Sequence, residues 1–372
     1  MKEVDSSTYK IITIGVVSFV IGYFIVLVFS KLAKNNNNKC NRYVYNTKVI
    51  TIFAFCCIIF YLPLFAQSFV ELIRGGSFES IRYTNRFEST ANTGIYNLIS
   101  YFIIQPFSSC LELIAPIDFW FGKRDRKLFF TTMILIFIRM ISDAGRTPFV
   151  NFMIYMVLCY CIVKGNKQKT KQEKRYNRII LSLFLVFALF VILYISISRS
   201  SSGLSRQLYF YFAMAPVLLN YWISLPESLS FGLASFNGFI FTVLYFLTNI
   251  TGTTYPNHFQ NVYDLIAATD STWIPIASGG VTANAYVSLF WFFYNDGGFA
   301  GIIIYSLIYG MLVTTVLFKI NNLSNIRFIA LYLLLMQGLI FSFIRFPFAK
   351  AQYCITFIII LILIHKESDV KI

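Results

Sequence analysis

Long runs of apolar residues are the feature that most restricts how this chain can fold. A helix of about 20 such residues crosses the hydrocarbon of a bilayer, and its backbone hydrogen bonds are all satisfied within the helix. A transmembrane barrel would instead show short segments of alternating polarity. Eleven suitable runs lie at about 11–30, 49–69, 95–117, 128–144, 148–163, 179–197, 207–224, 229–250, 298–318, 327–344 and 347–364. They predict an all-α fold, a polytopic transmembrane helix bundle of about 11 spans in a single integral membrane domain, 1–372.

The composition agrees with a membrane protein. Of the 372 residues, 57% are hydrophobic and 13% are charged, whereas a soluble domain is about 25% charged. The formal net charge of +15 would suggest nucleic-acid binding in a soluble protein. Here the Lys and Arg residues lie mainly in short segments between apolar runs, which is typical of topology signals. We therefore expect the lipid bilayer, and no nucleic acid, as a partner.

The distribution of Lys and Arg along the chain predicts its orientation in the membrane. Alternate connecting segments, beginning with 31–48, carry 20 of these residues, and the opposite set of segments carries nine. Positively charged loops stay on the cytoplasmic side. The N-terminus is therefore expected outside and the C-terminus in the cytoplasm.

One connecting segment, 251–297, is long and contains no Lys or Arg. The positive-inside rule places it outside. Its apolar part, 283–294, is too short to span a bilayer, which favours a re-entrant or interfacial helix. This long external loop is the expected location of polar chemistry.

Several arginines are predicted at the outer edge of the membrane, where a charge is costly and often functional. Arg139, Asp143 and Arg146 lie in FIRMISDAGRTPF, with spacing that places them on one helical face. An internal Arg139–Asp143 ion pair that joins two helices is the structural alternative. Arg199 and Arg206 flank a serine-rich segment, and Arg345 follows an apolar run directly. The planar guanidinium binds two phosphate oxygens at once. The five arginines, together with Asp143 beside them, are therefore candidates for binding a substrate that carries a diphosphate.

Two residues are candidates for moving a proton. His258 lies in the long external loop, and a histidine near neutral pH suits removal of a hydroxyl proton. Asp296, in YNDGGFAG, precedes a predicted helix and is the second candidate. A solvated loop histidine and a helix N-terminal cap are the structural alternatives. The sequence contains no cluster of metal-ligand spacing and no nucleotide phosphate loop, so we expect no metal and no cofactor.

Two stretches, SDAGRTPFVNFMIY and NAYVSLFWFFYNDGGFAGIIIYSLIYG, resemble the bacterial oligosaccharide repeat-unit polymerases, the Wzy family that assembles O-antigen and capsular polysaccharide. The number of spans and the late external loop agree with this resemblance. It implies a multi-pass enzyme of the bacterial cytoplasmic membrane. Such enzymes move a growing glycan from a polyprenyl diphosphate carrier onto the next lipid-linked repeat unit at the outer leaflet. A flippase and a chain-length regulator are the protein partners that this resemblance implies.

Three other functions fit part of the pattern. An O-antigen ligase performs the same chemistry with a different acceptor. A flippase for lipid-linked oligosaccharide, or another transporter, shares the substrate but is expected to show an internal repeat and charges along a central path. No repeat is evident in this sequence. A sugar acyltransferase is the third alternative.

Overall fold

A computed structural model of the chain describes residues 1–32, 43–78, 80–81, 94–164, 204–225, 228–320 and 325–366, with the single positions 175, 179, 182 and 186. It is mostly helical (77%), which confirms the predicted all-α class. The strands among the described residues are two short antiparallel pairs, in which β1 (Tyr43–Val44) pairs with β4 (His365–Lys366) and β2 (Ile274–Pro275) with β3 (Thr282–Ala283).

Five helical stretches are long and apolar enough to cross a membrane: Ser6–Ser30, Thr47–Ile73, Ile95–Phe121, Thr147–Lys164 and Ser288–Lys319. Four shorter apolar helices accompany them: Ala213–Ile223, Asn237–Thr251, Ile326–Ile340 and Ala351–Leu363. These helices are compatible with a membrane protein. The predicted number of 11 spans stays a prediction, since the run at 179–197 falls almost wholly outside the described residues.

The chain divides into two compact units, each assembled from three separate segments. The first unit comprises Met1–Lys39, Ser205–Asn321 and Gly338–Ile355, and the second comprises Cys40–Leu204, Asn322–Gln337 and Thr356–Ile372. Helices α13 (Ile326–Ile340) and α14 (Ala351–Leu363) contribute residues to both units. The single membrane domain expected from the sequence stays a prediction.

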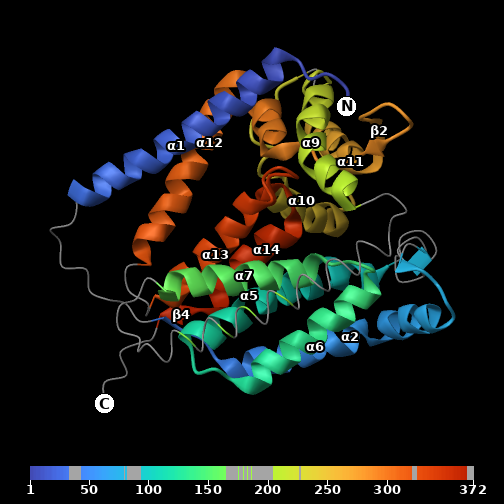
Figure 1. Cartoon of the computed structure of the whole chain (residues 1–372), viewed down its shortest axis with the longest axis vertical. Coiled ribbons are helices and arrows are strands. Elements are labelled where there is room, and N and C mark those ends of the chain that lie inside the picture. The colour runs from blue at the N-terminus through green and yellow to red at the C-terminus, as the bar shows by residue number, and fades with distance from the viewer. Residues whose placement is uncertain are drawn as a thin grey trace. The chain divides into compact units, whose positions relative to one another are not determined.

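In the first unit, α1 (Ser6–Leu32) and α12 (Ser288–Lys319) lie side by side (Figure 1). Glycines allow their backbones to approach closely. A Cβ added at Gly22 would lie 2.2 Å from the carbonyl oxygen of Leu307, and one at Gly310 would lie 2.2 Å from that of Phe19. Small residues at such contacts are typical of helix pairs in membranes.

Three more helices belong to the first unit: α9 (Leu204–Ile223), α10 (Asn237–Thr251) and α11 (Asn257–Ser271), which lies within the long loop. The predicted helix at 229–250 begins only at Asn237, because 231–236 form turns. The apolar segment 283–294 leads directly into α12, whose helical geometry is interrupted at Gly297 and Gly298. Most of 283–294 therefore belongs to α12, and the separate helix of the long loop is α11. A re-entrant or interfacial position of 283–294 stays a prediction.

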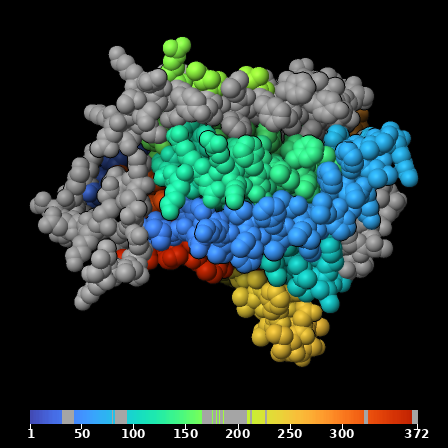
Figure 2. Space-filling model, turned by 90° about the horizontal axis from the view of Figure 1, so that it is seen from below, coloured from blue at the N-terminus to red at the C-terminus, as the bar shows by residue number. Residues whose placement is uncertain are grey.

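In the second unit, α2 (Thr47–Ile73) packs against α6 (Arg126–Ser142), and α5 (Gln105–Phe121) packs against α7 (Thr147–Lys164). Short stretches, α4 (Ile95–Ile99) and the π-helix η2 (Ser100–Ile104), lead into α5. The surface of α2 forms a continuous band in Figure 2 (blue), and several of its large apolar side chains are exposed, Ile52, Phe55, Ile59 and Ile73 among them. Such an outward-facing apolar surface suits contact with lipid.

Polar side chains set the starts of two of these helices. The Asn46 side chain accepts hydrogen bonds from the amides of Lys48 and Val49, and that of Asp125 accepts from Lys127 and Leu128. Helix N-termini leave amides without partners, which such caps satisfy. A longer-range contact joins the segment before α2 to the last turn of α5: the Tyr45 hydroxyl donates to Asp118 Oδ1 at 2.7 Å. Burial and this carboxylate raise the pKa of Tyr45.

Candidate functional site

The second unit holds a group of charged and polar side chains inside its helices, here called the inner cluster: Glu112, Arg139, Asp143, Asn151 and Gln337. Glu112 of α5 is almost fully buried, with 2% of its side chain exposed, and its Oε1 pairs with Nη1 of Arg139 from α6. Arg139 is 11% exposed. A charge buried this deeply needs a partner, and here each charge has one.

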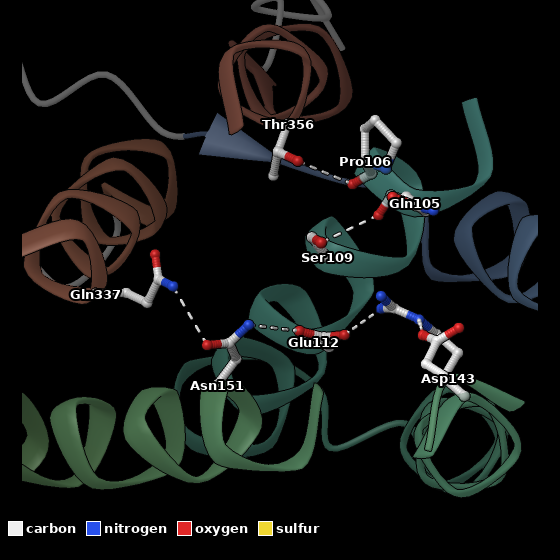
Figure 3. Close-up of polar contacts among 9 residues, drawn as sticks. Gln105, Pro106, Ser109, Glu112, Asp143, Asn151, Gln337 and Thr356 are labelled. Carbon is white, nitrogen blue, oxygen red and sulfur yellow. Dashed lines mark hydrogen bonds and ion pairs between the residues drawn. The ribbon is translucent and has the colours of Figure 1, made fainter. Parts of the chain in front are cut away.

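Amides extend the inner cluster to two further helices. Asn151 of α7 donates to Glu112 Oε2 at 3.3 Å, and Gln337 of α13 donates to Asn151 Oδ1 at 3.2 Å. In Figure 3 the three side chains point toward one another from three separate helices. The same view contains a separate bond from the Thr356 hydroxyl to the carbonyl oxygen of Pro106, 3.1 Å long. The inner cluster thus has the character of a connection between helices.

The sequence-predicted residues Arg139 and Asp143 do meet. Arg139 Nε lies 3.9 Å from Asp143 Oδ2, one helical turn away, and the Asp143 side chain is 44% exposed. The ion pair of the structural alternative forms, but within the end of α6. The carboxylate that joins Arg139 to a second helix is Glu112. Arg146 follows in the turn between α6 and α7 and is half-buried. Binding of a substrate by these three residues stays a prediction.

The first unit holds a second charged group, here called the loop cluster: Thr269, Asp270, Arg345 and Lys350. Arg345 lies just beyond the end of α13, and 6% of its side chain is exposed. Its Nη2 donates to Asp270 Oδ1 at 2.5 Å and to the Thr269 hydroxyl at 2.9 Å. The guanidinium carbon lies 5.8 Å from the ring centre of Phe292. Asp270 is 51% exposed, so this pair lies at the boundary between protein interior and solvent.

Backbone hydrogen bonds hold the long loop around Arg345. The amide of Ala285 donates to the carbonyl oxygen of Thr269 at 2.8 Å, and Asn284 Nδ2 donates to that of Asp270 at 2.5 Å. At the start of α12, the amide of Ser288 donates to the carbonyl oxygen of Ile344 at 3.1 Å. The segment after β3 is therefore bound to the end of α11, which carries Asp270, and the start of α12 is bound to the residue before Arg345.

Lys350 adds a second positive charge to the loop cluster. It follows the short 3₁₀ helix η3 (Pro347–Ala349), and the residue as a whole is exposed. Its ammonium is turned toward the protein, where loss of surrounding water and repulsion by Arg345 lower its pKa to about 8, while Asp270 acts in the opposite direction. At neutral pH the two cations and one carboxylate leave this group with a net positive charge, which suits an anionic ligand.

Asp296 has the surroundings of a structural carboxylate. It is buried in α12 immediately before the glycine interruption. Its Oδ1 accepts from the Ser230 hydroxyl at 2.5 Å and from the amide of Ala234 at 3.0 Å, and its Oδ2 accepts from the amide of Ser235 at 3.0 Å. Asp296 therefore fixes the turns that precede α10. This structural role differs from the expected N-terminal cap, because Asp296 lies inside α12 and not before the start of a helix. A catalytic role stays a prediction.

Three residues predicted from the sequence remain: His258, Arg206 and Arg199. His258 is exposed in the first turn of α11. Arg206 belongs to α9 in the first unit, and its side chain, like the whole of Arg199, lies outside the described residues. The proposed convergence of Arg146, Arg199, Arg206 and Arg345 therefore stays a prediction.

Sequence reasoning missed two carboxylates that matter in the structure. The sequence could have indicated Glu112, since an acidic residue inside an apolar run is costly in a membrane unless it is paired. For Asp270 the sequence indicates only its place in the external loop, because its partner Arg345 is 75 positions away. No group of three or more metal-binding side chains occurs among the described residues.

Comparisons with protein-family models, curated proteins and solved structures found no significant match.

Proposed function

We propose that this chain is a membrane glycosyltransferase that polymerises oligosaccharide repeat units carried on polyprenyl diphosphate. It acts at the outer leaflet of the bacterial cytoplasmic membrane, with the N-terminus outside and the C-terminus in the cytoplasm. The proposal rests on the resemblance of the sequence to repeat-unit polymerases and on the chemistry of the loop cluster.

The observation that carries the proposal is the position of Arg345. A buried guanidinium lies directly beyond an apolar helix and contacts the long loop that lacks Lys and Arg. The substrate of a repeat-unit polymerase has the same division into an apolar tail and a charged, sugar-bearing head. A site at the end of an apolar helix, with net positive charge and half-exposed polar groups, suits such a molecule.

The reaction needs stabilisation of a leaving diphosphate and removal of a proton from a sugar hydroxyl. Cations fixed beforehand around the developing negative charge supply the first requirement without a metal. In this proposal Arg146, Arg199 and Arg206 bind the diphosphate. Arg345 contributes its charge while it remains paired with Asp270. An ammonium is a point charge, so Lys is a poor replacement for these side chains.

The test is the length distribution of glycan made by cells that carry single Ala substitutions of Arg146, Arg199, Arg206 and Arg345. We expect long chains to disappear while single repeat units still form, with unchanged abundance of the protein in the membrane. Losing one such donor lowers the rate about a hundred- to a thousand-fold. Arg126→Ala is the matched control, since Arg126 is exposed at the start of α6 in a segment predicted to be cytoplasmic.

The result separates this function from its alternatives. Full-length polymer from all four variants would contradict a diphosphate site made of these arginines. Loss of transfer to a lipid core, with polymer retained, would indicate a ligase. Accumulation of lipid-linked units at the inner leaflet would indicate a flippase.

The orientation has its own test. Reporter fusions at positions 35, 170, 265 and 370 should report cytoplasm, cytoplasm, outside and cytoplasm in that order. A cytoplasmic signal at position 265 would contradict the proposed position of the loop cluster, and with it the proposed site of reaction.

A further inference from the structure

We infer that Asp270 is the catalytic residue that takes the proton from the acceptor hydroxyl, and that Arg345 is the residue that positions it. This inference rests on the proposed function and makes it more specific. It assigns to Asp270 the role of base that the sequence predicted for His258 or Asp296.

The geometry leaves one oxygen of Asp270 available. Oδ1 is held by Arg345 Nη2 at 2.5 Å. Among the described residues, Oδ2 has no hydrogen-bond partner, and half of the side chain is exposed. The carboxylate is thus fixed in direction by a buried guanidinium and presents a free acceptor atom to the solvent side. A base needs this combination of fixed orientation and open access.

The supporting contacts fix the carboxylate from several elements. Thr269 donates its hydroxyl to the carbonyl oxygen of Ile266 at 2.6 Å and accepts from Arg345. Asn284, which follows β3, donates to the carbonyl oxygen of Asp270 itself. Arg345 is in turn fixed by the start of α12, through the bridge between Ser288 and Arg345. The position of Asp270 therefore depends on α11, the loop after β3 and the segment after α13.

The two residues predicted from the sequence lack these properties. Both oxygens of Asp296 already accept hydrogen bonds from buried groups. His258 is exposed at the opposite end of α11, and none of the described residues forms a hydrogen bond or ion pair with its ring. Asp270 alone of the three is both oriented and open.

The proposed step is a displacement at the anomeric carbon of the donor sugar. The acceptor hydroxyl oxygen forms a bond to that carbon as the bond from the carbon to the phosphate oxygen breaks. The electron pair of the broken bond leaves with the polyprenyl diphosphate. The hydroxyl proton passes to Oδ2 of Asp270, which later returns it to water.

The experiment uses the full chain in lipid vesicles, supplied with lipid-linked repeat units extracted from cells that lack this gene. Asp270→Asn keeps an oxygen for Arg345 and removes the proton acceptor. We expect its kcat to fall about a hundred- to ten-thousand-fold, with little change in KM. Asp264→Asn is the matched control, since Asp264 is an exposed residue of the same helix that accepts a hydrogen bond from Gln260. It should retain the activity of the unchanged protein.

A second variant distinguishes loss of the catalytic carboxylate from loss of the fold. Asp270→Ala should recover part of its rate when formate is added, because formate supplies a carboxylate in place of the missing one. A merely structural role would show no such recovery. Failure of the unchanged protein to make polymer would overturn the proposed function. Polymer made at a normal rate by Asp270→Asn, or a loss confined to KM, would overturn the role of Asp270 and leave the proposed function standing.

Discussion

The inner cluster and the loop cluster each contain a buried arginine paired with a carboxylate, but they differ in what surrounds the pair. Glu112, the partner of Arg139, is 2% exposed, and both of its oxygens are bound by protein groups. Asp270, the partner of Arg345, is 51% exposed and has one oxygen bound. Counting ionisable side chains, the inner cluster has one basic and two acidic groups, whereas the loop cluster has two basic groups and one acidic group.

This difference indicates separate tasks. In the inner pair both carboxylate oxygens are bound by side chains of other helices, which gives a connection between helices that is costly to break from one side. In the loop pair one carboxylate oxygen is open at the surface, which provides a place for a ligand. We therefore assign a structural role to the inner cluster and a role in substrate binding and catalysis to the loop cluster.

Breaking the inner pair from one side should have the largest effect on stability. Glu112→Ala leaves Arg139 buried without its main partner, and we expect the free energy of unfolding to fall by about 3–5 kcal/mol. Thermal unfolding of the detergent-solubilised protein measures this. The double variant Glu112→Leu with Arg139→Leu should recover most of the loss, because no charge then remains buried. A double variant as unstable as the single one would show that the pair has other essential contacts.

Breaking the loop pair should cost less. Arg345→Ala removes a charge-assisted hydrogen bond to a half-exposed carboxylate, which is worth about 1.5–3 kcal/mol. The same melting measurement, made beside Glu112→Ala, compares the two clusters directly. A larger loss for Arg345→Ala than for Glu112→Ala would reverse the assignment of tasks.

The outermost amide of the inner cluster should matter least for stability. Gln337→Leu removes one neutral hydrogen bond, to Asn151 Oδ1 at 3.2 Å, and should cost about 0.5–1.5 kcal/mol. Glycan length should be unchanged at equal membrane abundance. Shortened glycan with normal abundance would show that this cluster reaches the substrate after all.

The smallest expected effect concerns pH. The pKa of Lys350 is lowered to about 8, so its ammonium loses its proton as the pH rises from 7 to 9. Losing this one charge from the edge of the loop cluster weakens binding of an anionic donor by about 0.2–1 kcal/mol, or up to about fivefold in KM. Steady-state kinetics at both pH values should show this rise, and Lys350→Met should abolish it. A rise that persists in Lys350→Met would assign the titration to another group.

Much of the fold follows from the sequence, since apolar runs decide where helices form in a membrane protein. The runs at 128–144 and 148–163 correspond to α6 and α7 within a few residues. The run at 229–250 does not, because Asp296 binds the amides of Ala234 and Ser235 and holds turns where a helix was predicted. That contact spans more than 60 positions, and local patterns carry no information about it.

The site was less predictable for the same reason. The spacing of Arg139 and Asp143 correctly predicted that they meet, because residues four apart share a helical face. The partnerships of Arg139 with Glu112 and of Arg345 with Asp270 depend on which helices and loops pack together. The candidate arginines could be picked out from the sequence by residue type. Their carboxylate partners could be identified only from the tertiary structure.

The most direct test of the central claim is the glycan length distribution of two variants compared at equal membrane abundance. One is Arg345→Ala, which breaks the loop cluster, and the other is the double variant Glu112→Leu with Arg139→Leu, which removes the inner pair. The account predicts that long chains vanish in the first and persist in the second. Long chains from Arg345→Ala, together with their loss in the double variant, would contradict it and place the chemistry in the inner cluster.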